Sequence, residues 1–171
     1  MNASARPVVA AESLDAEALY ADLLEGIRPL LKAGAVLVGI WSGGAWLAER
    51  LHADLGLPGQ AGVISSALHR DDFARRGLAG TDPTRLPFEI EGSHIVLVDD
   101  VLFTGRTIRA VLNELYDFGR PSSVTLAVLV DRAGRELPIE AAFAAARIDG
   151  SAAERISLGR DEAGRLRFET R

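Results

Sequence analysis

Residues 94–107, with the sequence HIVLVDDVLFTGRT, constrain the fold of this chain more than any other segment. The apolar first half predicts a buried strand over residues 95–98, which ends in two carboxylates, Asp99 and Asp100. A glycine and two threonines follow at once, and a helical pattern then runs over residues 106–118. A strand, a tight turn and a helix in direct succession are typical of a parallel sheet, in which ligands bind at the carboxyl ends of the strands.

Apolar runs elsewhere in the chain predict further strands. The run over 124–130 is almost uniformly apolar, as expected of a strand buried on both faces of a sheet. Because helical patterns alternate with the longer strands, we predict an α/β fold with a central, mainly parallel sheet flanked by helices. Strands are predicted over 36–40, 62–68, 95–98 and 124–130, and shorter ones over 144–148, 155–158 and 165–168.

Two further helices are predicted before the central segment. Ser13 is the expected N-cap of a helix over 14–31, whose last turn contains Pro29. Ser42, Gly43 and Gly44 are expected to form a turn that precedes a helix over 45–55.

The domain organisation is expected to be simple. A length of 171 residues suits one domain, which we place at 13–171 after a flexible tail at 1–12. Residues 70–88 are rich in glycine, proline and arginine, and a loop of this length is often functional.

Composition excludes several classes of protein. Apolar residues make up 48% of the chain and charged residues 25%, as in ordinary globular domains. A net charge of -5 argues against a general polyanion binder. The chain has no cysteine, which excludes disulfides and thiolate metal sites, and its three histidines show no ligand spacing. No apolar run reaches the roughly 18 residues needed to span a bilayer, and no signal peptide is evident, so we expect a cytoplasmic protein without membrane partners.

The central segment combines two kinds of binding group. Adjacent carboxylates at Asp99 and Asp100 can accept hydrogen bonds from vicinal hydroxyls and can favour a nearby cationic centre. The start of the following helix, from Thr104 to Thr107, offers backbone N–H groups and two hydroxyls to an anion. Together these groups predict a site for a sugar phosphate.

Residues 98–110, VDDVLFTGRTIRA, resemble the phosphoribosyl-pyrophosphate signature of the type I phosphoribosyltransferases. The resemblance is closest to the branch of PyrR-type pyrimidine regulators and uracil phosphoribosyltransferases. It extends over roughly residues 14–160 and implies the type I phosphoribosyltransferase fold, with a small hood beside the sheet. The other matching segments are 38–40, 69–73, 119–123, 126–132 and 135–139.

The resemblance also implies a role for each site residue. Asp99 and Asp100 would hold the ribose 2- and 3-hydroxyls and favour positive charge at C1, and Mg²⁺ would bind near them, mainly through substrate and water. The long loop is expected to close over the site. The 5-phosphate would bind Val101, Leu102, Phe103, Thr104, Gly105, Arg106 and Thr107; pyrophosphate would bind Ser42, Gly43, Gly44, Arg70 and Asp71; and the base would bind Asp131, Arg132 and Arg135.

The predicted reaction converts uracil and phosphoribosyl pyrophosphate into UMP and pyrophosphate, in a homo-oligomer that is a dimer or larger. The first alternative is a regulator that binds the leader of pyrimidine mRNA and has this activity as a secondary one. Such regulators bind RNA with a basic face, part of which lies on the N-terminal helix. The face is basic because cationic side chains are needed to bind the phosphates of the RNA backbone. Here that helix carries Asp15, Glu17, Asp22 and Glu25 against Arg28 and Lys32, which argues against RNA binding.

Other readings are less consistent with the sequence. Gly43 stands at a position where many regulatory members of the family carry arginine. Without that cation the expected affinity for pyrophosphate is lower, unless another arginine takes its place. A purine phosphoribosyltransferase stays open, because 98–110 does not itself read the base. A phosphoreceiver domain conflicts with the threonine-rich turn after the two carboxylates, and a dinucleotide site lacks the G-x-G-x-x-G that would follow 36–40.

Overall fold

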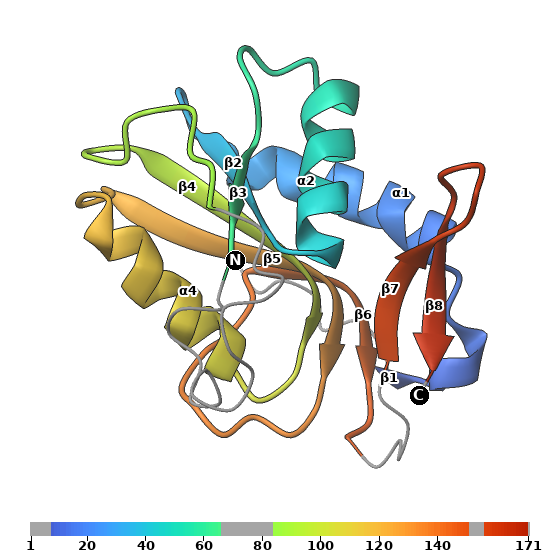
Figure 1. Cartoon of the computed structure of the whole chain (residues 1–171). Helices are drawn as coiled ribbons and strands as arrows, with labels where there is room; N and C mark the ends of the chain where they lie inside the picture. Colours follow the sequence, from blue (N-terminus) through green and yellow to red (C-terminus); the bar gives the residue numbers. More distant parts are fainter. Residues whose placement is uncertain (1–7, 66–83, 151–155, 171) are drawn as a thin grey trace.

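The computed structural model describes residues 8–65, 84–150 and 156–170. Its centre is a six-stranded sheet with the order β1-β6-β5-β4-β2-β3, in which all neighbouring strands are parallel. A separate antiparallel hairpin, β7–β8, stands beside this sheet (Figure 1). The strands are β1 (Val8–Val9), β2 (Val36–Ile40), β3 (Gly62–Ile64), β4 (His94–Leu102), β5 (Ser123–Arg132), β6 (Phe143–Ile148), β7 (Ile156–Arg160) and β8 (Leu166–Thr170). The predicted α/β architecture with a central parallel sheet is confirmed.

Helices cover both faces of the sheet: α1 (Ala16–Ile27) and α2 (Gly43–Asp54) lie on one face, and α4 (Arg106–Asp117) lies on the other (Figure 1). Successive side chains of a strand point to opposite faces, so each central strand contributes to two cores. Leu37 and Val96 belong to the core with α1 and α2, whereas Val38 and Leu97 belong to the core with α4. This alternation explains the uniformly apolar strands. Among the described residues, no helix has the length and apolarity that a membrane crossing requires.

β4 is longer than predicted. The expected strand stopped at Val98, but the parallel ladder with β5 continues until Leu102 pairs with Asp131. Both strands therefore run past their apolar stretches, since backbone pairing does not depend on the polarity of the side chains. Asp99 and Asp100 lie within the strand rather than after it.

The first helix begins later than predicted. Asp15 is its N-cap, because its Oδ1 accepts hydrogen bonds from the backbone N–H groups of Glu17 (3.0 Å) and Ala18 (3.1 Å). The hydroxyl of Ser13 instead donates to the carbonyl of Ala10 at 2.7 Å. The α-helix ends at Ile27 and a 3-10 turn over Arg28–Leu30 follows, in keeping with a proline in the last turn.

The described part of the predicted tail belongs to the fold. Val8 and Val9 pair in parallel with Arg147 and Ile148 of β6, and a 3-10 turn follows over Ala11–Ser13. A strand of two residues leaves no periodic pattern in a sequence, so only the pairing reveals it.

The ends of the long central loop are held together at the edge of the sheet. The predicted strand over 62–68 is described as Gly62–Ile64, and residues 66–68 lie outside the described ranges. Val63 and Arg85 exchange two backbone hydrogen bonds of 2.8 Å each. Residues 65 and 84, which flank the undescribed stretch, therefore lie close to each other.

Polar contacts attach α1 to α2 and to the hairpin. Glu17 of α1 pairs with Arg50 of α2 at 2.9 Å, and it also accepts the backbone N–H of Leu166 in β8 at 2.9 Å. The hydroxyl of Tyr20 donates to Asp54 Oδ2 at 2.6 Å. Burial, and then the hydrogen bond to Asp54, raise the pKa of Tyr20 well above its usual range. The two side-chain contacts join α1 to α2, and the bond from Leu166 to Glu17 attaches the hairpin to α1.

Glycines allow α2 to approach the sheet closely. A Cβ at Gly44 would lie 2.3 Å from the carbonyl oxygen of Val98 in β4, and one at Gly39 would lie 2.3 Å from the carbonyl oxygen of Gly44. The predicted turn over Ser42, Gly43 and Gly44 is therefore corrected: α2 begins at Gly43, and both glycines form part of its first turn. The two glycines are explained by the close approach of α2 to β4, which leaves no room for a Cβ atom at either position, and not by a turn.

We expect Gly44→Ala to lower the free energy of unfolding by about 1–3 kcal/mol, because the added methyl group meets rigid backbone of β4. Chemical denaturation measures the change. Glu49→Ala, on the exposed side of the same helix, is the matched control and should change the value by less than about 0.5 kcal/mol. Equal stability of Gly44→Ala and the wild type would contradict the packing described.

Candidate active site

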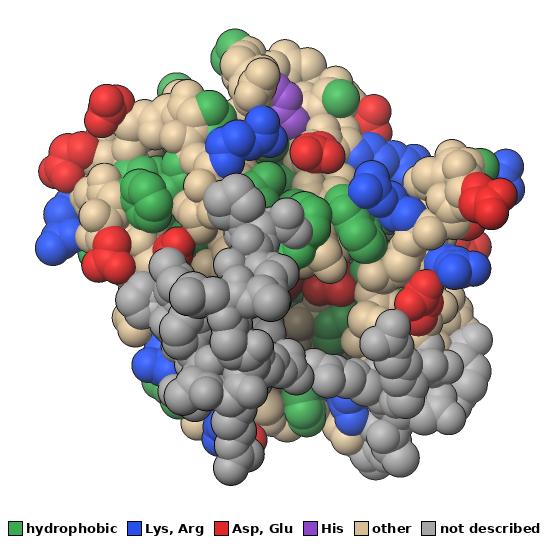
Figure 2. Space-filling view, viewed as in Figure 1, with side chains coloured by type: hydrophobic (Ala, Val, Ile, Leu, Met, Phe, Trp, Pro, Cys, Tyr) green, Lys and Arg blue, Asp and Glu red, His purple; other side chains and the backbone are tan. Residues whose placement is uncertain are grey.

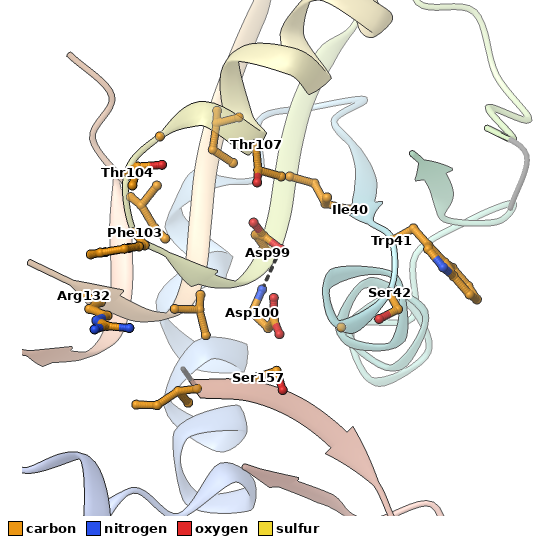
Figure 3. Close-up of a pocket in the computed structure, with 16 residues that line it drawn as sticks. Ile40, Trp41, Ser42, Asp99, Asp100, Phe103, Thr104, Thr107, Arg132 and Ser157 are labelled. Atoms are coloured by element: carbon orange, nitrogen blue, oxygen red, sulfur yellow. Dashed lines mark hydrogen bonds between the residues drawn. The ribbon is translucent and has the colours of Figure 1, made fainter. Parts of the chain in front are cut away.

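A cavity of about 380 Å³ lies at the carboxyl ends of β2, β4 and β5 (Figure 3), where ligands of parallel sheets bind. The start of α2 borders one side, the start of α4 borders another, and β7 contributes from the hairpin. Figure 2 shows a recess on this side of the molecule with an acidic side chain inside it. The lining residues are Ile40, Trp41, Ser42, Gly43, Asp99, Asp100, Val101, Leu102, Phe103, Thr104, Gly105, Thr107, Ile108, Arg132, Ile156 and Ser157.

The two carboxylates face different parts of the cavity because they are neighbours on one strand. Asp99 is turned towards Thr107, and Asp100 towards Ser157 (Figure 3). Asp99 is only 6% exposed, and its Oδ1 accepts the backbone N–H of Asp100 at 3.0 Å. Asp100 Oδ2 accepts the backbone N–H of Leu158 in β7 at 3.0 Å. The hairpin thereby orients the second carboxylate.

Gly43 is the point of closest contact between α2 and the carboxylates. A Cβ at this position would lie 2.6 Å from Asp100 Oδ2 and 2.7 Å from its Cγ. A side chain at residue 43 would therefore displace the Asp100 carboxylate from the position in which it accepts the hydrogen bond from the backbone N–H of Leu158. The peptide bond just before this point, between Trp41 and Ser42, is cis.

The turn after β4 is shaped to present backbone N–H groups. Gly105 has φ of +89°, in the left-handed region that glycine adopts without strain. α4 begins at the next residue, and the backbone N–H of Arg106 donates to Thr104 Oγ1 at 3.3 Å. The first turn of a helix after such a loop attracts anions, since its N–H groups have no partner within the helix.

The structure brings together most of the predicted site. Ser42, Gly43, Asp99, Asp100, Arg132, Thr107 and residues 101–105 line the cavity. Of the described residues predicted for the site, Gly44, Arg106, Asp131 and Arg135 do not line it. Arg70 and Asp71 lie outside the described residues.

Three of the four residues outside the lining have protein partners instead. Arg106 Nε contacts Glu136 Oε2 at 2.7 Å. Arg135 donates to the carbonyl oxygen of Phe103 and to Asp131 Oδ1. The side chains of Asp131 and Arg135 thus hold the loops around the cavity together.

Arg132 differs from these neighbours because it reaches the cavity. Its guanidinium lies 4.4 Å from the centre of the Phe103 ring, and Nη2 contacts the carbonyl oxygen of Gly150 at 3.5 Å. Figure 3 shows it beside Phe103, across the cavity from Ser42. It is the one cationic side chain among the described residues that line the cavity.

Sequence reasoning missed five lining residues: Ile40, Trp41, Ile108, Ile156 and Ser157. Three of them adjoin predicted segments, and the strand end before Ser42 could have indicated Ile40 and Trp41. The indole of Trp41 points away from Asp99 (Figure 3). No local signal indicates Ile156 and Ser157, because they reach the cavity only through the placement of the hairpin.

The donor set suits a magnesium ion that is bound mostly by substrate. Within the described ranges no three His, Cys, Asp or Glu residues gather as a complete metal site. Asp99 and Asp100 offer carboxylate oxygens at the cavity, and Mg²⁺ commonly uses one or two carboxylates with substrate phosphates and water. The residues present therefore fit this ion.

Comparison with known proteins agrees with this arrangement. Residues 15–151 match the family model described as phosphoribosyl transferase domain. A protein of Ralstonia nicotianae named bifunctional protein PyrR is 50% identical over 163 residues, which cover 92% of this chain and 88% of that protein. A protein of the same name from Nitrosococcus oceani is 45% identical over 153 residues, covering 85% of this chain and 86% of that protein.

Solved structures share the fold at low sequence identity. A hypoxanthine-guanine phosphoribosyltransferase from Bacillus anthracis superposes with a TM-score of 0.61 at 16% identity, covering 80% of each chain. A hypoxanthine phosphoribosyltransferase from Staphylococcus aureus gives 0.59 at 22% identity, covering 80% of this chain and 76% of the other. These likenesses confirm the predicted type I phosphoribosyltransferase fold. Together with the family match and the relatives at 45–50% identity, they show that the chain belongs to the phosphoribosyl transferase domain family, as a phosphoribosyltransferase of the PyrR type.

Proposed function

We propose that this protein transfers the phosphoribosyl group of phosphoribosyl pyrophosphate to uracil, forming UMP and pyrophosphate. The observation that carries the proposal is the cavity in which Asp99 and Asp100 lie between the first turns of α2 and α4. This arrangement offers acceptors for sugar hydroxyls in the middle and N–H groups for phosphate at two sides. The similarity to proteins named PyrR supports a pyrimidine as the acceptor.

Asp99 and Asp100 would accept the ribose 2- and 3-hydroxyls and stabilise the positive charge that develops at C1 as pyrophosphate leaves. Fixed charges aimed at a developing charge lower the barrier without reorganising. Residues 101–107 would bind the 5-phosphate, with the backbone N–H groups of the turn at Gly105 and of α4 as donors. Holding both ends of the sugar would fix C1 in place for attack.

Pyrophosphate would bind at the start of α2, where Ser42 and Gly43 line the cavity close to Asp100. Backbone N–H groups and the Ser42 hydroxyl would contact its oxygens. By the family resemblance, Arg70 would add a cationic contact with Asp71 nearby; both residues lie outside the described ranges. Magnesium, held by the carboxylates together with substrate oxygens and water, would neutralise charge on the leaving group.

The base would lie towards Arg132. Uracil presents two carbonyl oxygens and one N3–H, so a cation and a few backbone groups can satisfy it. Arg132 supplies the cation, and backbone groups around residues 131–135 supply the rest. The solved purine enzymes share the fold at identities below 25%, so their substrates do not transfer to this chain.

The charges of the first helix favour catalysis as the function of this protein and argue against RNA binding by that helix. α1 (Ala16–Ile27) contains no lysine or arginine. Its acidic residues have partners within the protein: Asp15 caps the helix, Glu17 pairs with Arg50, and Glu25 pairs with Arg28 at 3.3 Å. The helix itself therefore offers no cation to a phosphate backbone. A dimer or larger homo-oligomer stays a prediction, which light scattering in solution measures.

We expect the purified protein, with Mg²⁺ and phosphoribosyl pyrophosphate, to form UMP from uracil. Release of pyrophosphate, measured in parallel with uracil, cytosine, guanine and hypoxanthine, checks the acceptor. Turnover of guanine or hypoxanthine but not of uracil would assign the protein to the purine enzymes instead.

Asp100→Asn should lower kcat by about 10²-fold, because a charge that stabilises the developing cation is lost. The fold should be retained, since the Asn carbonyl oxygen can still accept the backbone N–H of Leu158. Steady-state kinetics and the circular dichroism melting curve measure the two effects. The matched control is Glu162→Gln at the exposed turn of the hairpin, which should leave both unchanged. An unchanged kcat in Asp100→Asn would remove this residue from the mechanism.

We expect no salt-sensitive, sequence-specific binding of pyrimidine leader RNA that depends on Arg28 and Lys32, the basic residues that follow α1. A gel-shift titration at low salt, with a scrambled RNA of equal length, measures it. Specific binding that falls when Arg28 and Lys32 are both changed to glutamine would overturn this expectation.

A further inference from the structure

We propose that Arg135 is a positioning residue for the phosphate-binding turn rather than a contact to the base. Together with the backbone of Glu136 and Leu137, it forms what we call the brace, residues 135–137. The inference rests on the proposed function in one respect, that the turn over residues 103–107 holds the 5-phosphate of the substrate.

The first part of the brace is the guanidinium of Arg135. One of its nitrogens, Nη1, donates to the backbone carbonyl of Phe103, and Nη2 donates to Asp131 Oδ1 at 2.5 Å. The side chains of Arg135 and Asp131 are 24% and 14% exposed, so this ion pair is screened only in part by water. Charge-assisted hydrogen bonds of this kind are stronger than neutral ones, and the planar fork of arginine can serve two acceptors at once.

The second part of the brace is its backbone. The N–H groups of Glu136 and Leu137 both donate to the carbonyl of Thr104, at 3.0 and 3.2 Å. The Glu136 carboxylate also contacts Arg106 Nε at 2.7 Å. Segments about thirty residues apart in sequence are thus joined at Phe103, Thr104 and Arg106 of the turn.

The carbonyls that the brace holds decide where the neighbouring N–H groups point. In a trans peptide the C=O of one residue and the N–H of the next point in opposite directions. Holding the carbonyls of Phe103 and Thr104 against the brace therefore directs the N–H groups of Thr104 and Gly105 to the other side. Phe103, Thr104 and Gly105 line the cavity. The brace in this way preorganises two donors for an anion.

Packing around Phe103 supports the same role. A Cβ at Gly134 would lie 2.4 Å from the Phe103 ring, and Arg132 lies over the ring at 4.4 Å. The turn is therefore clamped at Phe103 by both its ring and its carbonyl. Arg135 contributes to the clamp without lining the cavity.

The test measures binding of phosphoribosyl pyrophosphate by calorimetry, and separate KM values for phosphoribosyl pyrophosphate and uracil, in the full chain with Mg²⁺. In Arg135→Gln we expect Kd and KM for phosphoribosyl pyrophosphate to rise about tenfold or more, with KM for uracil changing less than about twofold. The matched control is Arg147→Gln: Arg147 lies 4.0 Å from the same carboxylate of Asp131 but belongs to β6, and it should leave all three constants unchanged.

Arg135→Lys separates geometry from charge, because lysine keeps the charge but not the two-pronged contact. We expect it to bind phosphoribosyl pyrophosphate less tightly than the wild type and more tightly than Arg135→Gln. If Arg135→Gln does not fold, as judged by its melting curve, the comparison of Arg135→Lys with the wild type decides alone.

Two results would overturn the inference: a rise in KM for uracil with unchanged affinity for phosphoribosyl pyrophosphate, or Arg135→Lys binding as tightly as the wild type. A wild-type protein that binds phosphoribosyl pyrophosphate but does not use uracil would refute the proposed function alone. Loss of binding in Arg135→Gln would then still support the brace.

Discussion

The parallel ladder between β4 and β5 is the constraint on which the rest of the site depends. It runs from the pair His94–Ser123 to the pair Leu102–Asp131, and it continues past the apolar part of both strands. Because it extends so far, the two carboxylates on β4 and Arg132 on β5 reach one cavity. The loops that follow these strands also start side by side, which allows residues 135–137 to form hydrogen bonds to the turn after β4.

A second constraint is the close contact of α2 with the sheet. Gly39 and Gly44 remove the side chains that would separate the helix from β2 and β4, and Gly43 removes the one that would meet Asp100. The start of α2 and the end of β4 are therefore parts of one wall of the cavity. Asp100 also accepts the backbone N–H of Leu158, so helix, strand and hairpin together determine the position of one carboxylate.

Much of this organisation could be predicted from local pattern. Apolar runs predicted the central strands, and the sequence after Asp100 predicted the turn and the start of α4, because these signals lie within a few residues of one another. Boundaries were less predictable. The cap of α1 is Asp15 rather than Ser13, since both residue types cap helices and only the chain path decides which one meets the free N–H groups. β1 could not be predicted, because two valines become a strand only by pairing with β6.

The sequence by itself determined the fold class, the family and the central groups of the cavity, because each of these depends on residues that are neighbours along the chain. Only the tertiary structure decided which charged side chains face the cavity. Asp131, Arg132 and Arg135 lie within five residues of one another, yet Arg132 lines the cavity while the other two pair with each other. Ile156 and Ser157 line it from the hairpin, far along the chain from the carboxylates. These outcomes follow from distances across the fold, between segments whose separation in sequence carries no information about their contact.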